Sequence, residues 1–168
     1  MASFEFRPFR MEDLSSFVKN ANDPFVADRL TDAFPHPYTE EHGRAFLERV
    51  IAASPPTHRA IVVDGEACGA VGLHAQSDVW KRNLEIGYWL AQKHGGQGIM
   101  TEAIKRMVEF GFATYPDIDR IFARPYGSNI ASQRVLEKAG FNLEANLIGT
   151  MVKRGRIEDE LIYAVRRT

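Results

Sequence analysis

The spacing of hydrophobic positions changes along residues 84–115 of the chain. Residues 84–90 form a short, mainly apolar run bounded by polar residues, which predicts a β-strand. Residues 94–98 follow with three glycines in four positions, a composition typical of a turn. Beyond Gly98 the apolar residues recur at spacings of three and four, with charged residues between them. This second pattern predicts an amphipathic helix over residues 99–115.

A glycine-rich turn between a strand and a helix has a chemical use. The first N–H groups of a helix lack intrahelical partners and lie at the positive end of its dipole. Glycines let an anion approach these groups, so main-chain donors can hold a phosphate or a pyrophosphate. The turn lacks the Gly-Lys-Ser/Thr ending of a nucleotide P-loop and the full spacing of a dinucleotide fingerprint. The residues alone therefore leave two interpretations open, an anion site or a tight connection.

Shorter patterns predict the other elements and the fold class. They are a strand at 4–8, a helix at 11–20, a short helix at 24–30, a helix at 40–53 capped by Thr39, a hairpin of strands at 58–63 and 67–74, a strand at 120–124, a helix capped by Asn129 and ended at Gly140, and strands at 141–148 and 157–165. This order predicts a single domain over residues 1–168 of the α/β (α+β) class. Its sheet should be mixed, mostly antiparallel and twisted, with about seven strands flanked by helices.

Composition and charge narrow the classes of protein. The chain has 168 residues, of which 45% are hydrophobic and 26% charged, as in a globular domain. A net charge of −1 gives no general attraction to nucleic acids or acidic membranes. No apolar run approaches the roughly 20 residues that span a bilayer, and MASFEFRPFR lacks the apolar core of a signal peptide. We therefore expect a soluble cytoplasmic protein with neither nucleic acid nor membrane as a partner.

The cysteine and the histidines predict neither a disulfide nor a metal site. Cys68 is the single cysteine, so an internal disulfide is ruled out, and its apolar surroundings favour a core position. The five histidines and the carboxylates show no spacing typical of metal ligands, so we expect no metal.

Several motifs carry a family resemblance. EIGYWLAQKHGGQGIMTEA at residues 85–103 and NIASQRVLEKAGF at residues 129–141 resemble the GNAT superfamily of acetyl-CoA-dependent N-acetyltransferases. FRPFRMEDL, FPHPYTEEHGRAFLE and RGRIEDELIYAV make the chain most similar to the RimJ/RimL branch of ribosomal-protein N-acetyltransferases. The resemblance covers nearly the whole chain. It implies a GNAT fold, acetyl-CoA as co-substrate, and direct transfer of the acetyl group to an amine.

The resemblance also implies which residues bind coenzyme A. The family's turn, Arg/Gln-x-x-Gly-x-Gly/Ala, aligns with residues 95–100, although Gly95 and Met100 depart from the pattern. The implied pyrophosphate site consists of Gln97, Gly98, Ile99, Met100 and Thr101, through main-chain N–H groups and the Thr101 hydroxyl. The implied pantetheine site lies along the preceding strand, at Tyr88, Trp89 and Leu90, where an N–H group polarises the thioester carbonyl. For the Trp89 side chain we favour core packing.

Asn129 and Arg134, at the predicted helix that Asn129 caps, each have two interpretations. Asn129 is an N-cap by its position, and the family's asparagine at this place also bonds the pantetheine. Arg134 is either a phosphate ligand or a solvated helix charge.

Glu85 and Ser132 are the candidate catalytic residues. Glu85 matches an acidic position of the branch and would accept a proton through a water; its alternative is an ion pair with Lys81 or Arg82. The tyrosine acid of many GNAT members aligns with Leu136, so the resemblance implies Ser132 as the proton donor instead. Ser132 has the alternative of merely tightening the helix start, and Tyr126 is the second choice as acid.

The acceptor side is assigned to His36, Tyr38, His74 and Tyr126, although His74 is also typical of a strand end. By resemblance, the first acceptor is a protein N-terminal α-amine. The alternatives are a small amine, such as an amino acid, polyamine or aminoglycoside, and a non-catalytic module that binds coenzyme A. The chain is expected to be a monomer or a homodimer.

Overall fold

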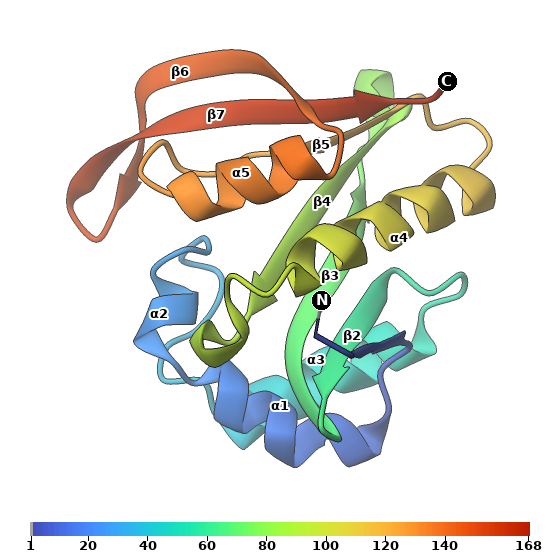
Figure 1. Cartoon of the computed structure of the whole chain (residues 1–168), viewed down its shortest axis with the longest axis vertical. Coiled ribbons are helices and arrows are strands. Elements are labelled where there is room, and N and C mark those ends of the chain that lie inside the picture. Colours follow the sequence, from blue (N-terminus) through green and yellow to red (C-terminus); the bar gives the residue numbers. More distant parts are fainter. Residues whose placement is uncertain (1) are drawn as a thin grey trace. The chain divides into compact units, whose positions relative to one another are not determined.

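A computed structural model describes residues 2–168 and contains seven strands and five α-helices (Figure 1). The strands are β1 (Glu5–Arg7), β2 (His58–Val63), β3 (Glu66–Ala75), β4 (Asn83–Leu90), β5 (Arg120–Ala123), β6 (Asn142–Lys153) and β7 (Arg156–Arg166). The α-helices are α1 (Leu14–Ala21), α2 (Pro24–Ala27), α3 (Glu40–Ala52), α4 (Ile99–Thr114) and α5 (Ile130–Lys138). Single-turn 3₁₀ helices lie at Met11–Asp13, Asp78–Trp80 and Gln92–His94. The predicted order of helices and strands is confirmed.

The strands form one mixed sheet in the order β1-β2-β3-β4-β5-β7-β6. The pairs β1–β2, β2–β3, β5–β7 and β6–β7 are antiparallel, whereas β4 and β5, which α4 connects, are parallel. The predicted fold class, a mostly antiparallel seven-stranded sheet with helices, is confirmed.

The last hairpin extends further than the sequence pattern predicted. β6 continues to Lys153, because the chain passes an irregularity between Leu147 and Met151, where Gly149 has a φ of 64°, and then resumes pairing. Arg154 and Gly155, with φ values of 48° and 78°, close the hairpin. Both central residues of a tight type I′ turn need positive φ, so this turn allows pairing up to its two ends.

The chain divides into two compact units. The N-terminal unit comprises the residues up to Gly72 together with Tyr88–Ala103, and the C-terminal unit comprises Leu73–Gly87 and Ile104–Thr168. The single domain over residues 1–168 stays a prediction. No helix within residues 2–168 combines the length and the apolar character that crossing a membrane requires.

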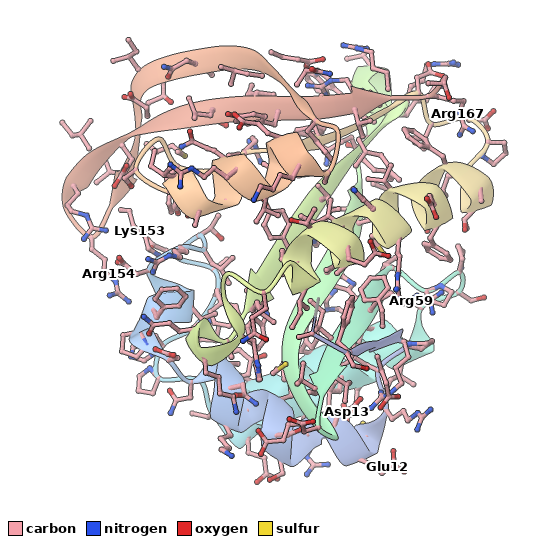
Figure 2. All side chains as sticks on the ribbon, viewed as in Figure 1. Glu12, Asp13, Arg59, Lys153, Arg154 and Arg167 are labelled. Atoms are coloured by element: carbon pink, nitrogen blue, oxygen red, sulfur yellow. The ribbon has the colours of Figure 1, made fainter. Side chains whose placement is uncertain are left out.

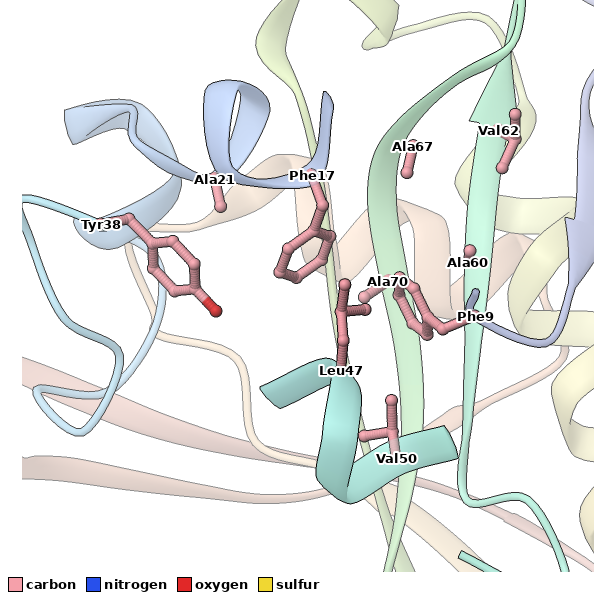
Figure 3. Close-up of a cluster of buried hydrophobic side chains, with 10 residues drawn as sticks. All are labelled: Phe9, Phe17, Ala21, Tyr38, Leu47, Val50, Ala60, Val62, Ala67 and Ala70. Atoms are coloured by element: carbon pink, nitrogen blue, oxygen red, sulfur yellow. The ribbon is translucent and has the colours of Figure 1, made fainter. Parts of the chain in front are cut away.

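Aromatic side chains build the core of the N-terminal unit (Figure 3). Phe17 of α1 is 1% exposed, and Figure 3 shows its ring directed toward Leu47 of α3. The Phe17 ring stacks on Phe46 with centroids 5.1 Å apart and meets Phe9 edge-on at 5.3 Å. Offset and edge-to-face pairs of this kind add to the stabilisation that burial alone gives. They fix α1 and α3 against β2 and β3.

The C-terminal unit has its own buried side chains. Leu84 and Ile121, which pair across β4 and β5, are 2% and 0% exposed. Leu136 of α5 is fully buried, and Tyr163 of β7 donates its hydroxyl to Glu137 of α5 at 3.0 Å. This contact fixes α5 on β7.

Asp13 is a buried carboxylate where the chain enters α1 (Figure 2). Arg7 donates to its two oxygens at 2.9 and 2.8 Å, and the Arg10 N–H donates at 2.8 Å. Burial acts to raise the pKa of Asp13, but the hydrogen bonds from Arg7 and Arg10 outweigh it, so the pKa is lowered.

Asp13 should therefore stabilise the protein in a pH-dependent way. A carboxyl group with a lowered folded-state pKa contributes stability above its unfolded value, about 3.9, and loses it as the pH falls through the folded value. Asp13→Asn should lower the free energy of unfolding at neutral pH by about 1–3 kcal/mol and flatten its fall below about pH 4. Urea unfolding across this range measures both effects. Glu12→Gln, at the exposed neighbouring position, is the control; an Asp13→Asn variant as acid-sensitive as the wild type would contradict the assignment.

Candidate functional site

A bulge in β3 positions the end of β4 within the N-terminal unit. The pairing of β2 with β3 passes from Ile61–Gly69 to Val62–Ala67, which leaves Cys68 as the extra residue. The Cys68 carbonyl accepts the Ala91 N–H at 2.8 Å. A Cβ on Gly69 would lie 2.7 Å from the Trp89 carbonyl oxygen, so glycine allows the close approach of β3 to this backbone. Sequence reasoning missed Gly69.

Cys68 itself is buried, as predicted. Burial raises the pKa of its thiol to about 11. A thiol with such a pKa carries almost no thiolate at neutral pH, so Cys68 serves structure rather than nucleophilic chemistry.

Tyr88, Trp89 and Leu90 form the half-buried end of β4. The Trp89 ring lies 5.4 Å from Phe17 and 6.3 Å from Phe34, between centroids, and packs against the aromatic core. Core packing of the Trp89 side chain is thus confirmed. The ladder between β4 and β5 runs over Asn83–Glu85, whereas β4 continues to Leu90.

The glycine-rich turn after β4 leads directly into the first turn of α4. Gly96 and Gly98 have φ values of 73° and 81°, in the left-handed region that favours glycine. Glu102 N–H donates to the Gly98 carbonyl at 3.1 Å, so the N–H groups of residues 99–101 precede the helical ladder of α4. The Ile99 and Met100 side chains, 0% and 8% exposed, anchor this helix start. The turn therefore presents main-chain donors at the positive end of a 16-residue helix.

Basic side chains beside the turn are already engaged. Lys93 and Lys19 both contact Glu66, at 3.1 and 2.9 Å. Their hydrogen bonds, that of Lys19 first, lower the pKa of Glu66 to about 2. Burial, and then the charge of Lys93, lower the pKa of His94. An anion at the turn would therefore depend mainly on backbone donors.

Asn129 caps α5 in the C-terminal unit, as predicted. Its Oδ1 accepts the Ser132 N–H at 3.2 Å. Its Nδ2 donates to no other residue within the described range 2–168 and remains available for a ligand carbonyl. The capping role and a ligand role thus use different atoms.

Side-chain hydrogen bonds hold the loop that precedes Asn129. Gln133, which sequence reasoning missed, donates its Nε2 to the Tyr126 and Gly127 carbonyls at 3.2 and 2.9 Å. Tyr126 is half-buried and forms an isolated bridge with Glu160 of β7. The loop before α5 is therefore held by a side chain of α5.

The proposed acid and phosphate ligand lie on α5. Ser132 is half-buried in its first turn, and Arg134 is exposed. Leu136, which replaces the family's tyrosine, is fully buried. Arg134 forms no ion pair with any other side chain in the described part of the chain.

Glu85 has a partner that sequence reasoning missed. Arg124, one residue beyond β5, donates Nε and Nη2 to the two carboxylate oxygens of Glu85, each at 3.0 Å. Its Nη1 lies 3.5 Å from Glu160 of β7. The expected alternative partner Arg82 instead pairs with Asp119. Glu85 is thus in an ion pair, but with Arg124 rather than with Lys81 or Arg82.

The proposed acceptor residues divide between the units. In the N-terminal unit His36 is exposed, whereas Tyr38 is 5% exposed and stacks on Phe34. Burial raises the pKa of Tyr38 to about 12. In the C-terminal unit His74 is exposed on β3, and a Cβ on Gly87 would lie 3.5 Å from its ring. No group of three or more His, Cys, Asp or Glu side chains among residues 2–168 is arranged to hold a metal ion.

Comparisons with known proteins give one consistent result. A family profile described as an acetyltransferase (GNAT) domain matches residues 4–142. The putative ribosomal N-acetyltransferase YdaF of Bacillus subtilis is 30% identical over 105 residues, which cover 62% of this chain and 56% of YdaF. The ribosomal-protein-serine acetyltransferase of Escherichia coli K12 is 30% identical over 83 residues, 49% and 46% of the two chains. The chain spans about half the length of the curated relatives it matches.

Solved structures show the same fold. RimL, described as a ribosomal L7/L12 α-N-protein acetyltransferase in complex with coenzyme A, superposes with a TM-score of 0.82 at 20% identity. The superposition covers 99% of this chain and 95% of RimL.

Proposed function

Because the chain belongs to the family of GNAT acetyltransferase domains, we propose that it is an N-acetyltransferase that moves an acetyl group from acetyl-CoA to a primary amine. One observation carries this proposal. Gly96 and Gly98 adopt positive φ between β4 and the first turn of α4, and a glycine-rich turn before a helix start supports binding of a pyrophosphate by main-chain N–H groups.

The residues present fit acetyl-CoA. A Cβ on Gly96 would meet no atom within 4 Å, so the turn has open space beside it. In the proposal, the N–H groups of Gln97, Gly98, Met100 and Thr101, with Ile99 as the anchor between them, hold the pyrophosphate. Tyr88, Trp89 and Leu90 are proposed to offer backbone groups to the pantetheine. By the family resemblance, Asn129 is proposed to bond the pantetheine through its Nδ2, and Arg134 to bind a phosphate.

The proposed chemistry needs a neutral amine and a protonated leaving group. Acetyl-CoA supplies the activated acetyl group as a thioester. An α-amino group, with a pKa of about 7.7–8, is more readily neutral than a lysine amine at about 10.4. Glu85 is proposed to take the amine's proton through a water, and Ser132 to deliver a proton to the departing sulfur. A backbone N–H at Trp89 or Leu90 is proposed to stabilise the charge that develops on the carbonyl oxygen.

The proposed acceptor is the N-terminal α-amine of a protein, and a ribosomal protein first of all. The names of YdaF and of the E. coli relative support this choice. Such an acceptor implies that the chain works in the cytoplasm. His36, Tyr38, His74 and Tyr126 are the proposed acceptor-side residues.

Thiol release in the presence of acetyl-CoA tests the function. The acceptors are peptides that begin with serine or alanine, the same peptides with a blocked N-terminus, and a panel of amino acids, polyamines and aminoglycosides. We expect thiol release only with free N-termini, and a mass gain of one acetyl group on the peptide. Release with small amines alone would overturn the acceptor proposal. Binding of acetyl-CoA without turnover of any acceptor would favour a non-catalytic coenzyme A module.

A further inference from the structure

Arg124 joins two carboxylates from different strands of the C-terminal unit. Its Nε and Nη2 bond the two oxygens of Glu85 on β4, and its Nη1 faces Glu160 on β7. All three guanidinium nitrogens are therefore directed at carboxylate oxygens. Because Glu85 pairs with Phe122 in the β4–β5 ladder, Arg124, two residues later, lies on the same face of the sheet as Glu85.

We propose that Arg124 is a positioning residue that fixes the carboxylate of Glu85 for proton transfer from the acceptor amine. This inference rests on the proposed function. It concerns a residue that lies outside the sequence motifs named above.

The geometry supports positioning more than stabilisation. A planar guanidinium that bonds both oxygens of a carboxylate fixes its rotation as well as its place. The lone pairs that face Arg124 are then occupied, so the remaining lone pairs of Glu85 define where a water can be held. Glu160, at 3.5 Å from Nη1, limits rotation of the guanidinium itself.

Exposure of the pair argues against a mainly structural role. The Arg124 side chain is 49% exposed and that of Glu85 24%. Ion pairs in contact with solvent contribute little to folding, because water screens them and both side chains lose conformational freedom. If replacing Arg124 lowers kcat strongly but changes the stability of the protein little, the role of Arg124 is therefore positioning rather than structural.

Arg120 provides a control on the same strand. It donates Nε and Nη2 to a single oxygen of Glu144, Oε2, at 3.0 and 2.7 Å, so it also makes an ion pair between strands. Arg120 does not contact Glu85 or Glu160 among the described residues.

A double-mutant cycle in the thiol-release assay tests the inference. Arg124→Gln should lower kcat about 10- to 100-fold, with the KM for acetyl-CoA changed by less than about twofold. In a Glu85→Gln background the same substitution should change kcat by less than about twofold, since its action depends on the Glu85 carboxylate. Arg124→Lys should recover part of kcat because it keeps the charge but not the fork. Arg120→Gln should leave kcat at the wild-type value.

Each outcome of this experiment supports or overturns the inference about Arg124. Equal losses of kcat from Arg124→Gln with and without Glu85 would show independent action and overturn the inference, as would an unchanged kcat in Arg124→Gln. If Arg124→Gln melts far below the wild type, Arg124→Lys and Glu160→Gln carry the test, and wild-type kcat in both would overturn it. A wild type that releases no thiol with any acceptor overturns the proposed function and this inference together. If the wild type turns over but the kcat losses of Arg124→Gln and Glu85→Gln are additive in the double variant, the inference alone is overturned.

Discussion

Replacing Gly98 by valine is expected to abolish stabilisation of the protein by acetyl-CoA. Gly98 has a φ of 81°, a conformation that a β-branched residue adopts only under strain. A valine there would either shift the turn or place two methyl groups beside the N–H groups at the start of α4. Either change removes the close approach that an anion needs. We expect the Kd for acetyl-CoA, measured by calorimetry, to rise at least about 100-fold, the loss of several charge-assisted hydrogen bonds.

Gly140 gives a control for backbone strain. It has a φ of 94°, lies just after α5, and a Cβ there would meet no atom within 4 Å. Gly140→Val should therefore cost about 1–3 kcal/mol of stability through strain alone and leave the Kd for acetyl-CoA unchanged. A Gly98→Val variant that binds acetyl-CoA as tightly as Gly140→Val would show that the turn is only a connection.

Phe17→Ala is expected to cause a large loss of stability. The ring is 1% exposed and contacts the rings of Phe9, Tyr38, Phe46 and Trp89 at centroid distances from 5.1 to 5.9 Å. Removing a fully buried phenylalanine costs about 3–5 kcal/mol, because a cavity remains where its contacts were. The free energy of unfolding of a domain is only about 5–15 kcal/mol, so the variant should be close to unfolding at room temperature.

Urea unfolding of both proteins measures this loss. Trp80→Ala is the matched aromatic control, since that side chain is 63% exposed, and it should stay within about 0.5 kcal/mol of the wild type. A Phe17→Ala loss no larger than that of Trp80→Ala would mean that the aromatic cluster is not the core of the N-terminal unit.

Local features of the fold could be predicted from the sequence. Thr39 accepts the His42 N–H at the start of α3, Asn129 caps α5, and Asp64 and Gly65 close the β2–β3 hairpin with φ values of 50° and 78°. Each depends on residues within a few positions, where capping and turn preferences act directly. The glycine-rich turn belongs to the same class.

Contacts between distant segments could not be predicted. The alternative interpretation of Glu85 was an ion pair with its sequence neighbours Lys81 or Arg82, but the partner in the structure is Arg124. That pairing depends on the register of two parallel strands joined through α4, and no local pattern reports a register. The role of Gly69 depends likewise on how closely β3 approaches β4, which the sequence shows only as a glycine in a strand.

Thermal unfolding of the wild-type protein at increasing acetyl-CoA concentration tests the central claim most directly. A ligand that binds only the folded state raises its stability by RT ln(1 + [L]/Kd). We predict a melting temperature that rises steadily with acetyl-CoA, rises with coenzyme A as well, and does not respond to acetate. A melting temperature unaffected by acetyl-CoA at every concentration would contradict the assignment of the Gly96–Gly98 turn as the cofactor site and the proposed function with it.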